Sequence, residues 1–189
     1  MRKAARVAIE AHEEAMRLCA PDLNEADIHA SLLRTITRNH CEPSYPPIVG
    51  GGVNACVLHY TANNQDLRDG DLLLVDAGAE YDGYASDITR TFPVNGKFSS
   101  EQRDLYDVVL AAQTAAIEQA RAGNQWQDVH NAAIRIVTEG MVDLGILSHT
   151  PDAAAESDEY RNFYIHNTGH WLGLDVHDVG EYTIDGHSR

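Results

Sequence analysis

Two aspartates, Asp76 and Asp87, are the residues of this sequence best placed to do chemistry. The segment 71–92 contains two β-rich runs around Asp82-Gly83, a dipeptide that favours a two-residue hairpin turn. With this turn, Asp76 pairs with Thr89, and Asp87 lies diagonally across from Asp76, about 7–8 Å away at the backbone. Two carboxylates that converge in an apolar hairpin repel each other unless a cation lies between them. The pattern therefore predicts a metal site.

A structural role remains the alternative for the same two side chains. Asp76 could accept a hydrogen bond from a neighbouring donor, and Asp87 could pair with Arg90 or lie near solvent. For a lone aspartate near a core this structural role is the favoured interpretation. The predicted convergence of two carboxylates is what shifts the balance towards a metal.

Histidines cluster near the end of the chain, where His166, His170 and His177 fall within one short segment. Each histidine alone is better explained by a structural role, but the three together with His59 favour a functional pocket. A metalloprotease helix would need a glutamate directly after the first histidine, and Asn167 stands there instead. We expect a strand or tight loop that brings His170 towards the hairpin.

Other catalytic classes lack their motifs. The sequence contains no nucleophile elbow, no phosphate loop and no dinucleotide fingerprint. The glycines at 50–52 do not form one of the two glycine-rich motifs, because they lack the strand-and-helix setting that such motifs need. A water molecule is then the favoured nucleophile. Two metals bridged by a carboxylate can convert water to hydroxide near neutral pH and polarise a carbonyl group.

The elements that would position these residues can be read from apolar spacing and caps. Helices are predicted over 4–19, after Asn24, after Ser99 (a capping box with Gln102) and up to the stop at Gly145. A short strand is predicted at 55–58, after a loop rich in proline and glycine. The expected buried stripes are Ala4, Ala8, Ala11, Ala15 and Leu18; Ile28, Leu32, Leu33 and Ile36; Leu105, Val108, Val109, Ala112 and Ala116; and Val129, Ala133, Ile136, Val137, Met141 and Leu144.

The two halves of the chain, 4–92 and 100–177, share one order of elements: helix, breaker, helix, irregular loop and a polar β segment around 163–165 in the second half. No residue-level repeat accompanies this order. A pseudo-twofold domain with a ligand site between its halves would have this order.

The charge balance excludes several partners. The chain has 14 Lys and Arg against 29 Asp and Glu, a formal charge of −15, which argues against nucleic acid and anionic membranes. We find no signal peptide and no apolar run of about 20 residues, so we expect a cytoplasmic protein. Cys19, Cys41 and Cys56 have no close spacing and are predicted to be reduced thiols.

Three segments resemble a known family. They are LHYTANN at 58–64, RDGDLLLVDAGAEYDGYASDITRTFPVNGKFS at 68–99 and HNTGHWLGLDVHDVG at 166–180. They resemble the Xaa-Pro aminopeptidases (aminopeptidase P) of the pita-bread metallopeptidase family, which also includes prolidase and methionine aminopeptidase. The resemblance covers essentially the whole chain. It implies an α+β pita-bread fold and an enzyme that removes an N-terminal residue preceding proline by attack of a metal-bound hydroxide.

The resemblance also implies roles for individual residues. Asp76 would bind one of two divalent metals, typically Mn²⁺, Asp87 would bridge both, and His170 would bind the second. His177 would hydrogen-bond the substrate or the tetrahedral intermediate. His59 and His166 would line the pocket that receives proline. The implied partner is a peptide with proline at its second position.

One departure from the family pattern concerns ligands. The family has two further glutamates beyond the histidine segment, and this sequence ends at Arg189, so we expect residues 1–189 to be a pita-bread catalytic domain incomplete at its C-terminus and without the family's N-terminal domain. We expect weak or no activity from it and, because of an unpaired sheet edge, association into a homo-oligomer. Prolidase and a non-catalytic pita-bread binding module are the alternatives.

Overall fold

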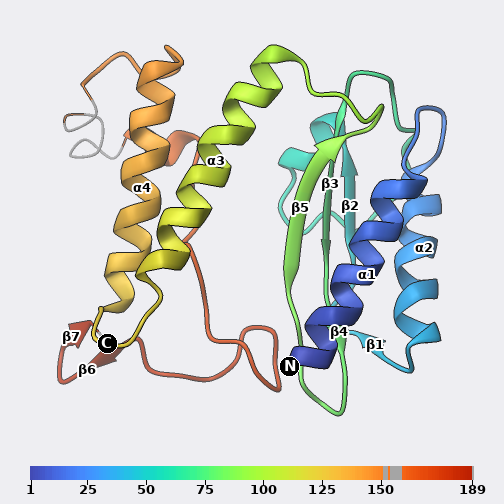
Figure 1. Ribbon diagram of the computed structural model, residues 1–189, viewed down its shortest axis with the longest axis horizontal. Coiled ribbons are helices and arrows are strands. Elements are labelled where there is room, and N and C mark those ends of the chain that lie inside the picture. The colour runs from blue at the N-terminus through green and yellow to red at the C-terminus, as the bar shows by residue number, and fades with distance from the viewer. Residues whose placement is uncertain (151–152, 154–158, 189) are drawn as a thin grey trace. The chain divides into compact units, whose positions relative to one another are not determined.

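The computed structural model of the protein describes residues 1–150, 153 and 159–188, which form two compact units. Unit 1 consists of Met1–Phe98 and Trp171–Val179, and unit 2 of Ser99–His170 and Gly180–Arg189. Helices and strands occur in both units (Figure 1). The expected mixture of α and β structure is confirmed. None of the helices in the described ranges is both long and apolar enough to span a bilayer.

Unit 1 is built from two helices on a small antiparallel sheet. Helix α1 (Arg2–Leu18) and helix α2 (Glu25–Arg38) lie side by side, as Figure 1 shows, and pack against strands β2 (Ile48–Gly51), β3 (Leu72–Ala77) and β5 (Ile88–Pro93), in the order β2-β3-β5. The predicted stripes are buried except at Leu18 and Leu33, and Asn24 forms the capping box of α2 with Asp27. Each large aliphatic side chain buried here contributes about 1.5–3 kcal/mol.

The hairpin between β3 and β5 has the predicted register. Asp76 pairs with Thr89, and Tyr81 pairs with Tyr84 across the turn. Asp82 and Gly83 both have positive φ, 51° and 79°, which is the conformation of the type I′ turn that this dipeptide favours. Beside the turn, the short strand β4 (Ala79–Glu80) pairs with β1 (Glu42–Pro43).

The strand predicted at 55–58 is wrong. The sheet instead uses β2, seven residues earlier at its start, and residues Gly52–Cys56 form the 3₁₀ helix η1. A Cβ on Gly50 would lie 2.9 Å from the backbone of Asn54, so the glycine allows η1 to fold back on the strand. Val57 and Leu58, whose apolar character suggested a strand, are exposed.

Unit 2 contains helices α3 (Ser100–Gln119) and α4 (Trp126–Asp143), the 3₁₀ helix η2 (Glu159–Asn162) and the strands β6 (Thr183–Ile184) and β7 (His187–Ser188). The capping box of Ser99 and Gln102 and the stop at Gly145 (φ 71°) are confirmed. The β segment expected around 163–165 is wrong, because within the described part of unit 2 these residues are irregular.

The predicted buried stripe of α3 is wrong in part. Ala112 and Ala116 are buried, whereas Leu105 and Val109 are about half exposed, because α4 packs on the alanine side of the helix. On α4, Ala133 and Met141 are buried as expected, whereas Leu144 is exposed. An apolar groove of about 890 Å³ runs along the two helices.

Candidate functional site

The two aspartates converge as predicted. Strand β3 alternates along its length, so that Leu73, Val75 and Ala77 are buried towards the helices while Asp76 lies on the opposite face. Asp87 lies just before β5. One hydroxyl joins the two carboxylates, because the Tyr45 O–H donates to Asp76 Oδ1 over 2.5 Å and to Asp87 Oδ1 over 2.9 Å.

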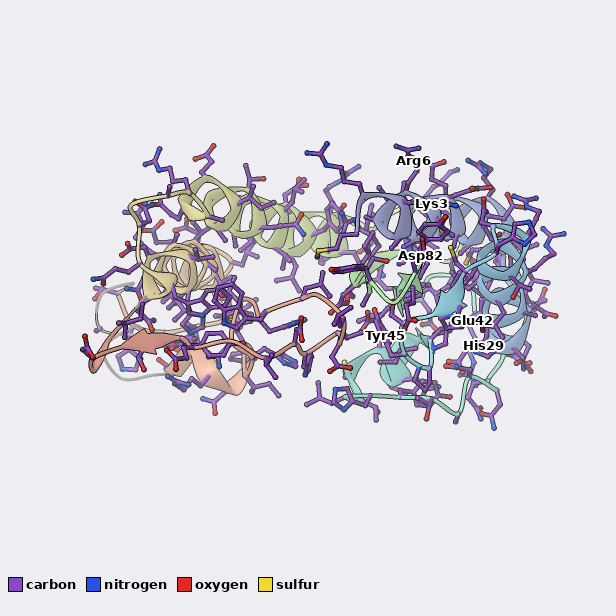
Figure 2. All side chains as sticks on the ribbon, turned by 90° about the horizontal axis from the view of Figure 1, so that it is seen from below. Lys3, Arg6, His29, Glu42, Tyr45 and Asp82 are labelled. Carbon is purple, nitrogen blue, oxygen red and sulfur yellow. The ribbon has the colours of Figure 1, made fainter. Side chains whose placement is uncertain are left out.

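Tyr45 reaches the carboxylates because the preceding residues are attached to the hairpin. The backbone N–H of Ser44 donates to the Gly78 carbonyl over 3.1 Å, and the N–H of Ser86 donates to Ser44 Oγ over 3.3 Å. A Cβ on Gly78 would lie 1.7 Å from the Ser86 carbonyl oxygen, so only glycine permits this close approach. Figure 2 labels Tyr45 together with Glu42 on this segment and Asp82 at the hairpin turn.

The electrostatics of Asp76 and Asp87 favour either protonation of a carboxylate or binding of a cation between the two. Burial raises the pKa of the Asp76 carboxyl, hydrogen bonds from Tyr45 and Thr89 oppose that rise, and the negative charge of Asp87 adds to it. Burial and the two carboxylates also raise the pKa of the Tyr45 hydroxyl well above its ordinary value, so the hydroxyl stays a neutral donor. A single hydroxyl hydrogen cannot neutralise two carboxylates.

The donor set fits a divalent cation in part. Carboxylate oxygens are the ligands that Mg²⁺, Ca²⁺ and Mn²⁺ prefer, and Asp76 and Asp87 supply a converging pair. Within the described ranges, however, no group of three or more His, Cys, Asp or Glu side chains is placed to hold a metal. The pair also satisfies the structural alternative, since Tyr45 is the neighbouring donor that Asp76 would require.

A cavity of about 390 Å³ opens at the aspartates, and its wall is part polar and part apolar. It gathers four of the six predicted site residues, all from unit 1. The lining residues are Tyr45, Pro46, Ile48, His59, Thr61, Asp76, Asp87, Val176 and His177.

The two histidines of the cavity lie on loops. His59 follows η1 and has a positive φ of 53°, which is uncommon for a residue with a side chain. His177 lies on the loop of Trp171–Val179, which the Gly173 carbonyl attaches to the hairpin by accepting from the Ala85 N–H over 2.8 Å. Within this loop the Asp178 carboxylate accepts from the Leu174 N–H over 3.1 Å. Of the two expected conformations, strand or tight loop, residues 171–179 adopt a loop, and they contain no helix.

His166 and His170 belong to unit 2 and are described with it. Thr168, midway between them, is held to the rest of the unit by two contacts of its hydroxyl, 2.7 Å from His130 Nδ1 and 2.9 Å from the Tyr164 hydroxyl. Neighbouring Gly169 lies against the Trp126 ring. These contacts fix the backbone that carries both histidines.

Sequence reasoning missed five residues of the cavity, which are Tyr45, Pro46, Ile48, Thr61 and Val176. Tyr45 stands between prolines in a segment without periodicity, and no motif identifies it. A pair of converging carboxylates requires a donor, but Tyr45 lies 31 positions before Asp76, so its place in the sequence does not single it out. The other four follow only from the conformations of β2 and of the loops.

Comparison with known proteins gives one consistent relationship. Residues 1–189 match metallopeptidase family M24. A Xaa-Pro aminopeptidase of Haemophilus influenzae is 51% identical over 187 residues, which are 98% of this chain and 43% of that protein. The structure of Pseudomonas aeruginosa aminopeptidase PepP superposes with a TM-score of 0.99 at 47% identity, covering 100% of this chain and 43% of its own. A variant of Escherichia coli aminopeptidase P in complex with substrate gives 0.96 at 46% identity, with the same coverage of both chains.

Proposed function

We propose, because this chain belongs to metallopeptidase family M24, that its residues form part of the active site of an aminopeptidase that hydrolyses the bond between an N-terminal residue and a following proline. The observation that carries the proposal is the convergence of Asp76 and Asp87 on one hydroxyl at the edge of a cavity. The chain spans 43% of the length of the relative from Haemophilus influenzae, so the activity of the whole protein is part of this proposal.

Asp76 and Asp87 are the residues that would hold the divalent metals, with Asp87 shared between two ions, and His170 is the third ligand that we propose. Mn²⁺ is the metal expected from the family. Such a metal pair supplies Lewis acidity, which activates water and polarises the peptide carbonyl. Tyr45 orients both carboxylates through its hydroxyl and keeps their oxygens converged.

The remaining residues of the cavity suit recognition of the peptide. Pro46, Ile48 and Val176 give the wall an apolar part, which fits a proline ring, and proline has no N–H that would need a partner there. His59 borders this wall, and His166 is the second histidine that we assign to the proline pocket. His177 is the residue that we expect to donate a hydrogen bond to the substrate carbonyl as negative charge develops on it.

Two carboxylates and one histidine hold a metal pair weakly, so we propose that residues 1–189 alone turn over slowly. We also propose that the chain self-associates, for a reason that is independent of metal binding. The groove along α3 and α4 is apolar, and Val109 and Ile117 are 55% and 65% exposed, so a second copy of the chain would bury surface there.

The proposal is tested by titrating the chain with Mn²⁺ and measuring release of the first residue from a tripeptide with proline at its second position. Asp76→Asn should abolish both metal binding and release. Asp82→Asn is the matched control, because Asp82 lies in the hairpin turn outside the cavity lining. A wild-type chain that binds the tripeptide but not Mn²⁺ contradicts the enzyme assignment, and cleavage restricted to dipeptides indicates a prolidase instead.

A further inference from the structure

The segment 52–65 carries two residues of the cavity, His59 and Thr61, yet it has few apolar contacts to hold it. Val53, Val57 and Leu58 are 84%, 53% and 56% exposed. Backbone bonds of η1 do not extend past Val57. Something other than hydrophobic burial must therefore fix the position of His59.

Glu25, the first residue of α2, provides that fixation. Its side chain is fully buried and accepts hydrogen bonds at both carboxylate oxygens. Oε1 accepts from the Gly51 N–H over 2.8 Å and from Asn54 Nδ2 over 3.0 Å. Oε2 accepts from the Tyr60 hydroxyl over 2.7 Å and from the Gln65 N–H over 3.0 Å. One oxygen therefore holds the start of the segment and the other holds its end.

The bond to Tyr60 holds the chain between two residues that line the cavity. Tyr60 lies between His59 and Thr61, and its hydroxyl also accepts from Asn54 Nδ2 over 3.1 Å, which closes a ring of contacts across the segment. Asn63 adds a separate attachment to β2, donating to the Pro47 carbonyl and accepting from the Val49 N–H, each over 2.9 Å. These bonds leave little freedom to the intervening backbone.

The charge of Glu25 suits this role. All four of its partners are neutral donors, and the carboxylate lies in the first turn of α2, where the helix dipole favours a negative charge. Burial alone would raise the pKa of the Glu25 carboxyl, but the four hydrogen bonds together lower it below its ordinary value. The group is therefore ionised at neutral pH and forms charge-assisted bonds.

We propose that Glu25 is a positioning residue for peptide recognition: its buried carboxylate fixes the segment 52–65 so that His59 and Thr61 form one wall of the cavity that Asp76 and Asp87 also line. The inference rests on the proposed function, since it gives that wall the task of binding a peptide. Glu25 itself is not among the residues that line the cavity.

Glu25→Gln tests the proposal with little change of volume. Its amide N–H₂ would have to replace one oxygen and would confront two donors, so half of the bonds would be lost. We expect at least one of the two backbone amides, Gly51 N–H or Gln65 N–H, to exchange with solvent about tenfold faster, because the oxygen that the N–H₂ replaces no longer accepts its charge-assisted bond. We expect the affinity for Ala-Pro-Ala to fall by about the same factor, while Mn²⁺ affinity stays unchanged.

Asp27→Asn is the matched control. It removes a negative charge from the same helix end, where Asp27 Oδ2 accepts from the Asn24 N–H over 2.9 Å. Asparagine keeps an acceptor for that N–H, so the bond by which Asn24 Nδ2 donates to the Asn64 carbonyl over 3.1 Å should stay in place. It should leave peptide affinity and the two exchange rates at their wild-type values. Tyr60→Phe serves where Glu25→Gln does not fold, because it removes a single donor to Oε2 and keeps the ring; its effects should be smaller and in the same direction.

Two results overturn the proposal. The first is unchanged exchange at Gly51 and Gln65 in both Glu25→Gln and Tyr60→Phe, and the second is an equal loss of peptide affinity in Glu25→Gln and Asp27→Asn. A wild-type chain that binds Mn²⁺ but no proline peptide contradicts the proposed function and, with it, the task assigned to this wall. The exchange rates then still decide whether Glu25 holds the segment, so the two failures are distinguishable.

Discussion

The Tyr45 hydroxyl donates to Asp76 Oδ1 over 2.5 Å, although the two residues are 31 positions apart in the sequence. The same oxygen lies 2.9 Å from Asp87 Oδ1, so a single neutral donor serves two carboxylates. The pairing of β1 with β4 brings Tyr45 to this place. The contact therefore connects the irregular segment before the sheet to the acidic face of the hairpin.

Tyr45→Phe should destabilise the metal-free protein by about 1–3 kcal/mol at neutral pH, because it leaves two converging carboxylates without their donor. Urea unfolding in the presence of a chelator measures this loss. Saturating Mn²⁺ should recover part of it, since a cation between the carboxylates replaces the hydroxyl. Tyr84→Phe, which changes an exposed tyrosine of the same hairpin, should have no effect.

Mn²⁺ should raise the melting temperature of the wild-type chain by several degrees. A ligand at 100 times its Kd stabilises a folded protein by about 2.7 kcal/mol. Asp87→Asn should remove the response, because it removes one of the two converging oxygen donors. Calorimetric scans with and without a chelator measure both values, and an equal rise in the variant would place the metal elsewhere.

Acid should weaken unit 1 through Glu25. Its hydrogen bonds hold the pKa of the folded carboxyl below its ordinary value. The contribution of Glu25 to the free energy of unfolding is therefore present above the unfolded pKa of about 4.3 and is lost as the pH falls through the folded pKa. The stability difference between wild type and Glu25→Gln should therefore shrink as the pH is lowered from 7 to 3. The exposed pair of Glu13 and Arg17 offers a control, since Glu13→Gln should give a small difference throughout.

Gly78→Ala should prevent correct folding of the hairpin or cost more than about 3 kcal/mol, because the new Cβ would meet the Ser86 carbonyl oxygen at 1.7 Å and Ser44 Oγ at 2.8 Å. Chemical unfolding measures the cost. Gly70→Ala separates the clash from backbone strain: Gly70 has a φ of 84° with nothing within 4 Å of a Cβ, so about 1 kcal/mol is expected there.

His59→Ala and His177→Ala should each lower the affinity for a proline tripeptide by about tenfold, the value of one lost pocket contact, and leave Mn²⁺ affinity unchanged. Isothermal titration with each ligand measures the two affinities separately. His149→Ala controls for the loss of a histidine, because His149 is an exposed partner of Glu159 in unit 2. Loss of Mn²⁺ binding in His59→Ala would make His59 a ligand instead.

The features that the sequence predicted correctly depend on local chemistry. The turn dipeptide at Asp82 fixes the hairpin register, and the caps at Asn24 and Ser99 fix two helix starts, because each needs only neighbouring residues. The failures need information from elsewhere in the chain. The apolar residues Val57 and Leu58 suggested a strand, whereas the hydrogen bonds accepted by Glu25 hold their segment as a loop.

The site was predicted to a similar extent. Asp76 and Asp87 converge as their register required, and His59 and His177 line the same cavity. Tyr45 could not be found in this way, because its approach depends on the close contact at Gly78 rather than on any spacing. The roles of all six residues, with His166 and His170 among them, remain predictions from the resemblance.

The alternation of strand β3 has a consequence for folding fidelity. Val75 lies in the core and Asp76 lies on the cavity face. A slip of one residue in pairing would exchange them, placing a charged group among the aliphatic side chains of α1 and α2 and a valine beside Asp87. Chains paired in the wrong register would thus lose both stability and the convergence of the two carboxylates. The acidic face therefore disfavours wrong pairing of the sheet that carries it.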